Sequence, residues 1–185
     1  DIQVTDVEAT NDPVVEGENL TVDVTVENNG TIRGVNENVT LRVDNDTDGT
    51  TDKEVDGEVN VSGNEQATVT LTYTTSAGDA DEVEVQAVTD DDMLGMTDTA
   101  QVDEPANITV TNVTSLNDPV TETDALNVEV GVQNTGDRLG ATDIGLNIYT
   151  AAGDTIEGVD VEEESFVAAG STKNVTLTYT THPGD

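Results

Sequence analysis

The chain has 185 residues with no cysteine and no tryptophan, and its 40 acidic side chains against 5 basic ones give a net charge of −35. A chain without cysteine cannot carry a disulfide framework. The negative charge makes nucleic acid and anionic membrane surfaces poor partners, so nucleic-acid binding is excluded as a function class.

The density of negative charge predicts how the protein responds to salt. A compact protein of this length exposes roughly 8,500 Å², so its excess charges lie about 15 Å apart. The Debye length is about 10 Å in 0.1 M salt and about 3 Å in 1 M salt, so only concentrated salt screens these charges from one another. We infer that the chain comes from an extreme halophile, an archaeon. The alternative, an acidic interaction tail, would lack the alternation described next.

Apolar and polar residues alternate in seven segments of the first hundred residues, rich in valine and threonine, which favour strands. The segments are Ile2–Val7, Leu20–Val26, Val39–Val43, Val55–Val61, Val69–Tyr73, Val83–Ala87 and Thr97–Val102. Clusters of Gly, Asn and Asp separate several of them: Asn28–Gly30, Asp48–Gly49, Ser62–Asn64 and Ala77–Asp79. Short strands with a turn about every dozen residues predict an all-β fold, an immunoglobulin-like antiparallel β-sandwich.

Three stretches recur 106 positions further along the chain. IQVTDVEATNDPV (2–14) returns as ITVTNVTSLNDPV (108–120), LTVDVTVENNG (20–30) as LNVEVGVQNTG (126–136), and TLTYTTSAGD (70–79) as TLTYTTHPGD (176–185). A fixed offset indicates the duplication of one domain. We therefore predict two tandem sandwiches, residues 1–103 and 107–185, joined by a short, semi-rigid segment that contains Pro105.

The second copy is predicted to lack its last strands, because the counterpart of Asp79 is Asp185 and the first copy continues for two strands more. In such a sandwich the sixth strand is central, and each buried polar group left unpaired costs about 1–3 kcal/mol. Three explanations follow: the natural chain continues, which we favour, a neighbouring copy donates a strand, or only the ordered part is represented. Strand donation would make the protein a filament subunit.

Membrane insertion of this segment is not expected. The chain has no apolar stretch long enough to cross a bilayer, and no basic-then-apolar leader stands at Asp1. It is therefore interpreted as a processed form or as a piece of a longer polypeptide.

Four segments resemble the CARDB and APHP group of immunoglobulin-like modules: 24–49 and 63–88 in the first copy, 130–154 and 168–181 in the second. The shared features are an Asn-x-Gly turn after the second strand, and a glycine-containing turn before a Thr/Val strand that ends in an aromatic residue. The resemblance implies a non-catalytic adhesion or spacer module of secreted and surface proteins of bacteria and archaea.

The segment DNDTDGTTDKEV (44–55) resembles the first half of a calcium loop, because hard oxygens recur at alternate positions around a glycine. Its candidate ligands are Asp44, Asp46, Asp48, Thr50 and Asp52. The twelfth position, however, is Val55 and not a glutamate, and the second copy has YTAAGD (149–154) at this place. The alternative is a solvated hairpin tip, and Asp90–Asp92 is interpreted as surface charge.

Eight Asn-x-Ser/Thr sequons make N-glycosylation a hypothesis for a surface protein. They lie at Asn19, Asn29, Asn38, Asn45, Asn60, Asn107, Asn112 and Asn174. The alternative is that threonine-rich strands beside asparagine-rich turns generate sequons by composition alone.

Catalysis has little support in the sequence. The single histidine, His182, replaces Ser76 of the first copy and is interpreted as a turn residue, and no cysteine nucleophile exists. Carboxylates are too abundant to discriminate a site. Tyr73, Tyr149, Tyr179 and Phe166 are too few for a stacking platform.

We therefore expect a structural or adhesive segment of a haloarchaeal protein, extracellular or on the cell surface, and not an enzyme. Its expected partners are other domains or copies of the same surface protein, glycans and neighbouring surface proteins; no cofactor is expected unless calcium binds. The competing hypotheses are a filament subunit completed by strand donation, an accessory binding module of a secreted enzyme, and a small calcium-dependent binder.

Overall fold

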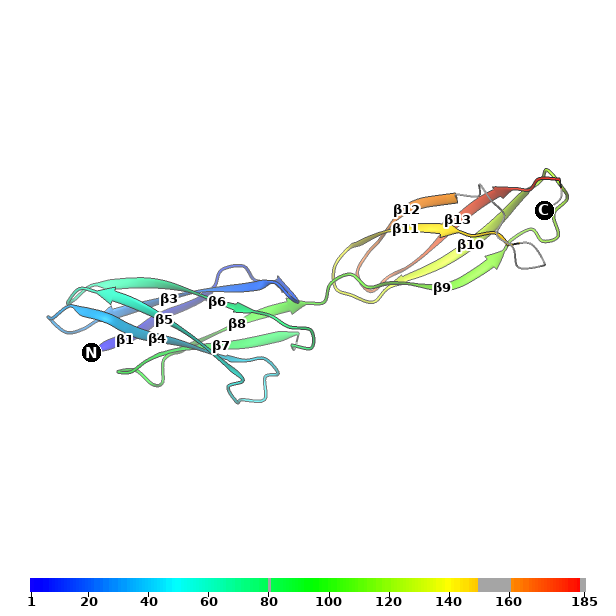
Figure 1. The fold of residues 1–185 in the computed structure, drawn as a ribbon. Helices are drawn as coiled ribbons and strands as arrows, with labels where there is room; N and C mark the ends of the chain where they lie inside the picture. The colour runs from blue at the N-terminus through cyan, green and yellow to red at the C-terminus, as the bar shows by residue number, and fades with distance from the viewer. Residues whose placement is uncertain (80, 150–160, 184–185) are drawn as a thin grey trace. The chain divides into compact units, whose positions relative to one another are not determined.

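The computed structural model describes residues 1–79, 81–149 and 161–183, and this part of the chain contains β-strands and no helix. Accordingly, it contains no helix that could span a bilayer. Two compact units divide the chain, Asp1–Glu104 and Pro105–Asp185 (Figure 1). The prediction of an all-β fold built from antiparallel sheets is confirmed.

The first unit is a sandwich of two sheets. Its strands are β1 (Ile2–Ala9), β2 (Val14–Val15), β3 (Asn19–Asn28), β4 (Gly34–Asp44), β5 (Lys53–Val61), β6 (Gln66–Thr74), β7 (Glu82–Thr89) and β8 (Met96–Asp103). One sheet has the order β1-β3-β6 and the other β2-β8-β7-β4-β5. All neighbours are antiparallel except the two-residue strand β2, which runs parallel to β8. Strand β7 is central, as expected for the sixth of the seven predicted strands.

The period-2 alternation places valine and leucine between the sheets. On β3, Leu20 and every second residue up to Val26 are fully buried, while the residues between them are partly exposed. Val39 and Val43 of β4 are also fully buried, on the opposing sheet. Burying one such side chain is worth about 1.5–3 kcal/mol, so these strands supply most of the stabilisation of the unit.

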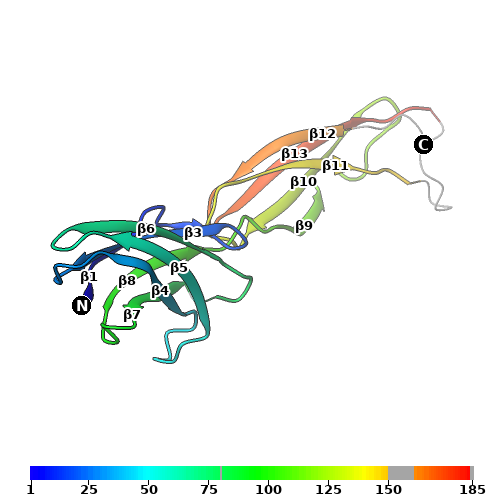
Figure 2. The ribbon, with the colours of Figure 1, turned by 60° about the vertical axis from the view of Figure 1, so that its left-hand side comes forward.

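The second unit repeats part of this arrangement. Its strands are β9 (Ile108–Ser115), β10 (Ala125–Asn134), β11 (Gly140–Leu146), β12 (Val161–Val167) and β13 (Thr172–Thr180). Strands β9, β10 and β13 form one sheet in the order β13-β10-β9, and β11 pairs with β12 (Figure 2).

Strand register is also repeated. Leu20 of β3 pairs with Tyr73 of β6, and Leu126 of β10 pairs with Tyr179 of β13. Each residue of the second pair lies 106 positions after its counterpart in the first pair. Within the described residues, the second unit has no counterparts of β7 and β8. By the same offset, β9 to β13 correspond to β1, β3, β4, β5 and β6 of the first unit.

A buried asparagine holds the turn after the second long strand in each unit. Asn28 is 2% exposed; its Nδ2 donates to the carbonyl oxygens of Ile32 (2.7 Å) and Val61 (3.4 Å), and its Oδ1 accepts from the Gly30 N–H (2.9 Å). Asn134 is fully buried and forms the equivalent bonds. Its Nδ2 donates to the carbonyl oxygens of Arg138 (2.7 Å) and Val167 (3.1 Å), and its Oδ1 accepts from the Gly136 N–H (3.1 Å). The Asn-x-Gly pattern thus marks a side chain that links a turn to the opposing sheet.

Replacing Asn28 by alanine should lower the free energy of unfolding of the first unit by about 1–3 kcal/mol, because it leaves buried backbone groups without a partner. The matched control is Asn29→Ala, since Asn29 is exposed and its Nδ2 donates only to the Gln3 side chain. The control should change stability by less than about 0.5 kcal/mol. Urea titration followed by circular dichroism measures both, and equal effects of the two substitutions would contradict this assignment.

Candidate functional site

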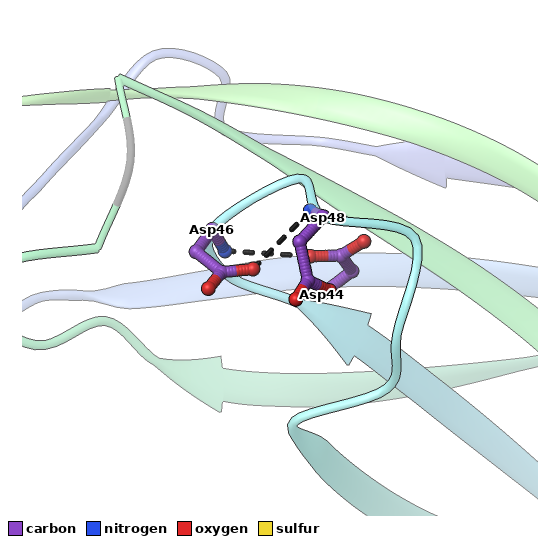
Figure 3. A group of neighbouring side chains, drawn as sticks. All are labelled: Asp44, Asp46 and Asp48. Atoms are coloured by element: carbon purple, nitrogen blue, oxygen red, sulfur yellow. Dashed lines mark hydrogen bonds between the residues drawn. The ribbon is translucent and has the colours of Figure 1, made fainter.

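The loop between β4 and β5 brings three aspartates together. One carboxylate oxygen from each of Asp44, Asp46 and Asp48 lies within 4.8 Å of the other two (Figure 3). Gly49 follows them with φ +87°, a left-handed conformation that glycine adopts without strain. The local sequence therefore folds into a tight turn because its short polar side chains bond to the backbone just ahead of them.

Hydrogen bonds within the loop already engage these carboxylates. Asp44 Oδ2 accepts from the Gly49 N–H at 2.7 Å, and Asp46 Oδ1 accepts from the Asp48 N–H at 3.2 Å. Asp48 Oδ1 accepts from both the backbone N–H (2.8 Å) and the hydroxyl (2.5 Å) of Thr50. The turn is closed by its own donors, and each carboxylate keeps an oxygen lone pair for a further partner.

The remaining calcium-loop candidates do not complete a ligand shell. Asp52 lies outside the group of three; its Oδ2 accepts from the Asn45 N–H at 3.1 Å. Val55, at the twelfth position, pairs with Leu41 inside the sheet, and the Glu54 carboxylate lies 3.4 Å from the Arg42 guanidinium. The structure thus brings together three of the four predicted carboxylates, and Thr50 lies beside them through its hydrogen bonds to Asp48. The corresponding YTAAGD segment of the second unit lies, after Tyr149, outside the described residues.

The loop shifts the pKa values of two neighbouring carboxyls in opposite directions. Burial acts to raise the pKa of Asp44, but the backbone N–H groups of Gly49, Asp46, Asp48 and Thr47 outweigh it and lower that pKa below its ordinary value. The Asp48 N–H acts to lower the pKa of Asp46, yet burial and the negative charges of Asp48, Asp52 and Asp44 outweigh it and raise that pKa. The negative charge of Asp46 is therefore disfavoured in this loop, and a bound cation would reduce that penalty.

The predicted sequons differ in how accessible they are. Seven of the eight asparagines are exposed; the exception is Asn45, which is half-buried and donates from Nδ2 to the Asp79 carboxylate at 2.9 Å. Asn38 and Asn112 donate from Nδ2 to the threonine of their own sequon, Thr40 (3.2 Å) and Thr114 (2.9 Å). The other exposed asparagines are Asn19, Asn29, Asn60, Asn107 and Asn174.

The tyrosine that ends the repeated strand has a different partner in each unit. The Tyr73 hydroxyl donates to Asp79 Oδ2 at 3.0 Å; burial, followed by this carboxylate, raises the pKa of Tyr73 to about 12. The Tyr179 hydroxyl lies 3.3 Å from His182 Nδ1, and the two rings are 6.0 Å apart. Both tyrosines are buried in their cores, as predicted, and His182 follows β13 directly in the chain.

Two facing antiparallel sheets with a valine core define the first unit as an immunoglobulin-like β-sandwich module. The CARDB family model matches residues 1–102, and the chain belongs to this family. No curated protein sequence matches the chain significantly.

The solved structures that resemble the chain do so only distantly. A transglutaminase of red sea bream is 14% identical, with a TM-score of 0.41, over 98% of this chain and 27% of that one. The secreted serine protease VesC of Vibrio cholerae is 16% identical, with a TM-score of 0.32, over 98% of this chain and 47% of that one. A chain of a chaperone–tip adhesin complex of CFA/I fimbriae biogenesis is 14% identical, with a TM-score of 0.29, over 98% of this chain and 94% of that one. The chain thus spans about a quarter of the transglutaminase and about half of the protease.

Substituting the aspartates should separate a solvated turn from a calcium site. In chelator, Asp46→Asn should raise the unfolding midpoint of the first unit, because the raised pKa of Asp46 means that its negative charge opposes folding at neutral pH. Asp44→Asn should lower the midpoint, because the lowered pKa of Asp44 means that its charge favours folding above the ordinary carboxyl pKa.

The same titrations in millimolar CaCl₂ at fixed ionic strength provide the comparison. If the three carboxylates hold Ca²⁺, Asp46→Asn becomes destabilising in calcium, since it removes a ligand. An unchanged sign identifies the loop as a solvated hairpin tip.

Proposed function

We propose that the chain is a non-catalytic structural or adhesive segment of an extracellular or cell-surface protein. The observation that carries this proposal is the CARDB match over residues 1–102. The strands of the first unit fit this role, because they bury a contiguous core and turn threonine, aspartate and glutamate outward. Such a module works as a rigid block that other domains or copies contact.

The second unit would be a further module of the same kind, so that the chain forms a tandem pair. Two observations support a tandem pair. The pairing of β10 with β13 repeats the pairing of β3 with β6 at an offset of 106 residues, and the buried asparagines Asn28 and Asn134 form equivalent hydrogen bonds. Repeated modules lengthen a surface polypeptide without requiring a new fold for each added segment.

The charge supports the proposal of a halophilic, archaeal origin. The net charge of −35 opposes compaction at low ionic strength and keeps the protein soluble in concentrated salt. With 5 basic side chains for 40 acidic ones, most carboxylates have no cation to pair with, so screening by salt is the main way to reduce their repulsion. Among the described residues, the N-terminus pairs with Asp91 and Arg42 pairs with Glu54.

A filament subunit is the second candidate, because the second unit leaves an apolar face open. Val110 is 61% exposed and Val113 is 59% exposed on that face. A strand from a neighbouring copy could in principle cover it by β-augmentation. Self-association of the chain decides between this candidate and a single surface polypeptide.

Salt should stabilise the protein. We expect the thermal unfolding midpoint to rise steadily from about 0.1 M salt towards multimolar NaCl or KCl, because the Debye length falls from about 10 Å to below 3 Å. Below about 0.5 M, NaCl and KCl should act alike at equal ionic strength, as screening requires. Circular dichroism at fixed pH measures the midpoint, and a flat response would contradict the halophilic assignment.

Surface location should make both units accessible from outside the cell. Intact cells of the source organism, held in their growth salt and treated with external protease, should release peptides of both units while a cytosolic marker stays inside. Mass spectrometry of these peptides should find carbohydrate only among the seven exposed sequons and none on Asn45, whose amide is engaged with Asp79. Release of these peptides only after cell lysis would exclude the proposed location.

A further inference from the structure

Side chains, and not a further strand, close the edge of the first sheet. Strand β1 is an outer strand of the sheet β1-β3-β6, and it lies beside β7 and β8 of the opposing sheet (Figure 1). No backbone ladder joins β1 to either of these strands in the described structure. An uncovered edge of this kind presents a row of N–H and C=O groups to any strand that approaches it.

Aspartates of the β7–β8 hairpin bind three N–H groups of β1. The carboxylates of Asp91, Asp92 and Asp98 accept from the N–H groups of Ile2 (3.0 Å), Val4 (3.3 Å) and Ala9 (2.9 Å). Each of these contacts spans 88 or 89 positions of the chain. Asp91 and Asp92, which the sequence indicates as surface charge, thus also bind the edge of a strand.

The segment that follows β1 forms the same kind of bond with β8. Asp12 Oδ1 accepts from the Gln101 N–H at 2.7 Å, again across 89 positions. In addition, the buried Thr89 hydroxyl at the end of β7 donates to the Ile2 carbonyl oxygen at 2.8 Å. We name the four aspartates that join β1 to the β7–β8 hairpin the aspartate seam: Asp12, Asp91, Asp92 and Asp98.

Two of the polar residues at this edge occupy positions that face the core. The buried positions that alternate along β7 include Ala87 and end with Thr89, and those along β8 begin with Asp98, two residues before Ala100. A polar side chain at such a position is costly unless it is hydrogen-bonded. Here Thr89 and Asp98 both find their partners on the backbone of β1. Charged residues that point inwards at an edge are one way in which β-sheet proteins prevent pairing between edges.

The turn between β7 and β8 holds Asp91 and Asp92 in place. The Asp92 N–H donates to the Thr89 hydroxyl at 3.0 Å, and Asp92 Oδ1 accepts from the Gly95 N–H at 3.0 Å. Gly95 has φ +51°, and a Cβ added there would overlap the Ala87 carbonyl oxygen, so the turn requires glycine. The turn therefore presents both carboxylates to β1 in a fixed conformation.

We propose that the aspartate seam closes β1 against strand addition, and that the partner it excludes is the same edge of a second copy of the chain. Without the carboxylates, Ile2, Val4 and Ala9 would present free N–H donors along an eight-residue strand that contains no proline. Two such edges can pair antiparallel about a twofold axis, because each supplies the acceptors that the other needs. The inference concerns the first unit alone and goes beyond the proposed function.

Concentrated salt makes such a closure necessary. In 1 M salt the Debye length is about 3 Å, whereas paired strands lie about 4.7–4.9 Å apart. The repulsion that separates two acidic copies in dilute buffer is therefore largely lost. A carboxylate that is hydrogen-bonded to a backbone N–H still acts under these conditions, because it occupies the donor and does not depend on long-range repulsion.

The test compares three double variants of the 185-residue chain in multimolar NaCl. Asp91→Ala/Asp98→Ala removes two acceptors of the seam, while Asp91→Asn/Asp98→Asn removes the same charge and keeps a side-chain oxygen that can accept. The matched control, Glu82→Ala/Asp90→Ala, removes the same charge from exposed positions outside the seam. Circular dichroism establishes that each variant is folded.

In dilute solution, amide exchange at Ala9 measured by NMR should be at least about tenfold faster in the alanine variant of the seam than in the control. At high concentration this variant should associate more strongly than the parent chain in light scattering. Exchange across residues 2–9 should then slow again, because the paired edges protect one another. The asparagine variant and the control should behave like the parent chain in both measurements.

Equal exchange at Ala9 in the alanine variant and the control would overturn the proposal. Fast exchange without added association at any concentration would also overturn it, as would association that leaves residues 2–9 unprotected. Equal association of the asparagine variant or the control would overturn it as well, because lost charge would then explain the effect. If the double alanine variant does not fold, Asp98→Ala alone provides the same comparison, since Asp98 binds Ala9 directly.

Discussion

An antiparallel sheet with one apolar face must have that face covered, and this requirement governs the whole chain. In the first unit two sheets meet this requirement for each other, and valines on β1, β3, β4 and β7 lie between them. In the second unit the described strands cover only part of the face, so Val110 and Val113 stay exposed. Leaving two such side chains uncovered forgoes about 3–6 kcal/mol, a large share of the 5–15 kcal/mol that usually stabilises a domain.

The acidic composition tightens this requirement. Repulsion among 35 excess negative charges opposes compaction, while the core consists mainly of valine, which buries less area than leucine or phenylalanine. Some of the acidic side chains nevertheless form hydrogen bonds within the fold. Asp44 closes a turn, Asp79 accepts from the Tyr73 hydroxyl, and Asp91 and Asp92 accept from backbone N–H groups of β1. Backbone N–H groups lower the pKa values of Asp44 and Asp91, so the charged forms of these two residues serve the fold at neutral pH.

Periodicity was sufficient to predict the long strands of the first unit and their buried faces, because side chains alternate strictly along a strand. It could not reveal β2, which has only two residues, or the burial of Asn28, whose partners are carbonyls 4 and 33 positions away. The role of Asp91 was missed for the same reason, since its acceptor contact to Ile2 spans 89 positions. The calcium-like spacing brought three carboxylates together, but the fold placed Val55 in a strand and Glu54 beside Arg42.

The second unit has a smaller and less well satisfied core than the first among the described residues. Ser165 is fully buried, and its hydroxyl has no hydrogen-bond partner among the described residues, whereas the equivalent position in the first unit is Val59. An unpaired buried hydroxyl costs about 1–3 kcal/mol, and the smaller side chain also contributes less apolar area. The buried core of the second unit is also smaller among the described residues, and β11 pairs with β12 alone, whereas β4 pairs with both β5 and β7. The same requirement for a covered apolar face is therefore met more fully in the first unit than by the described strands of the second.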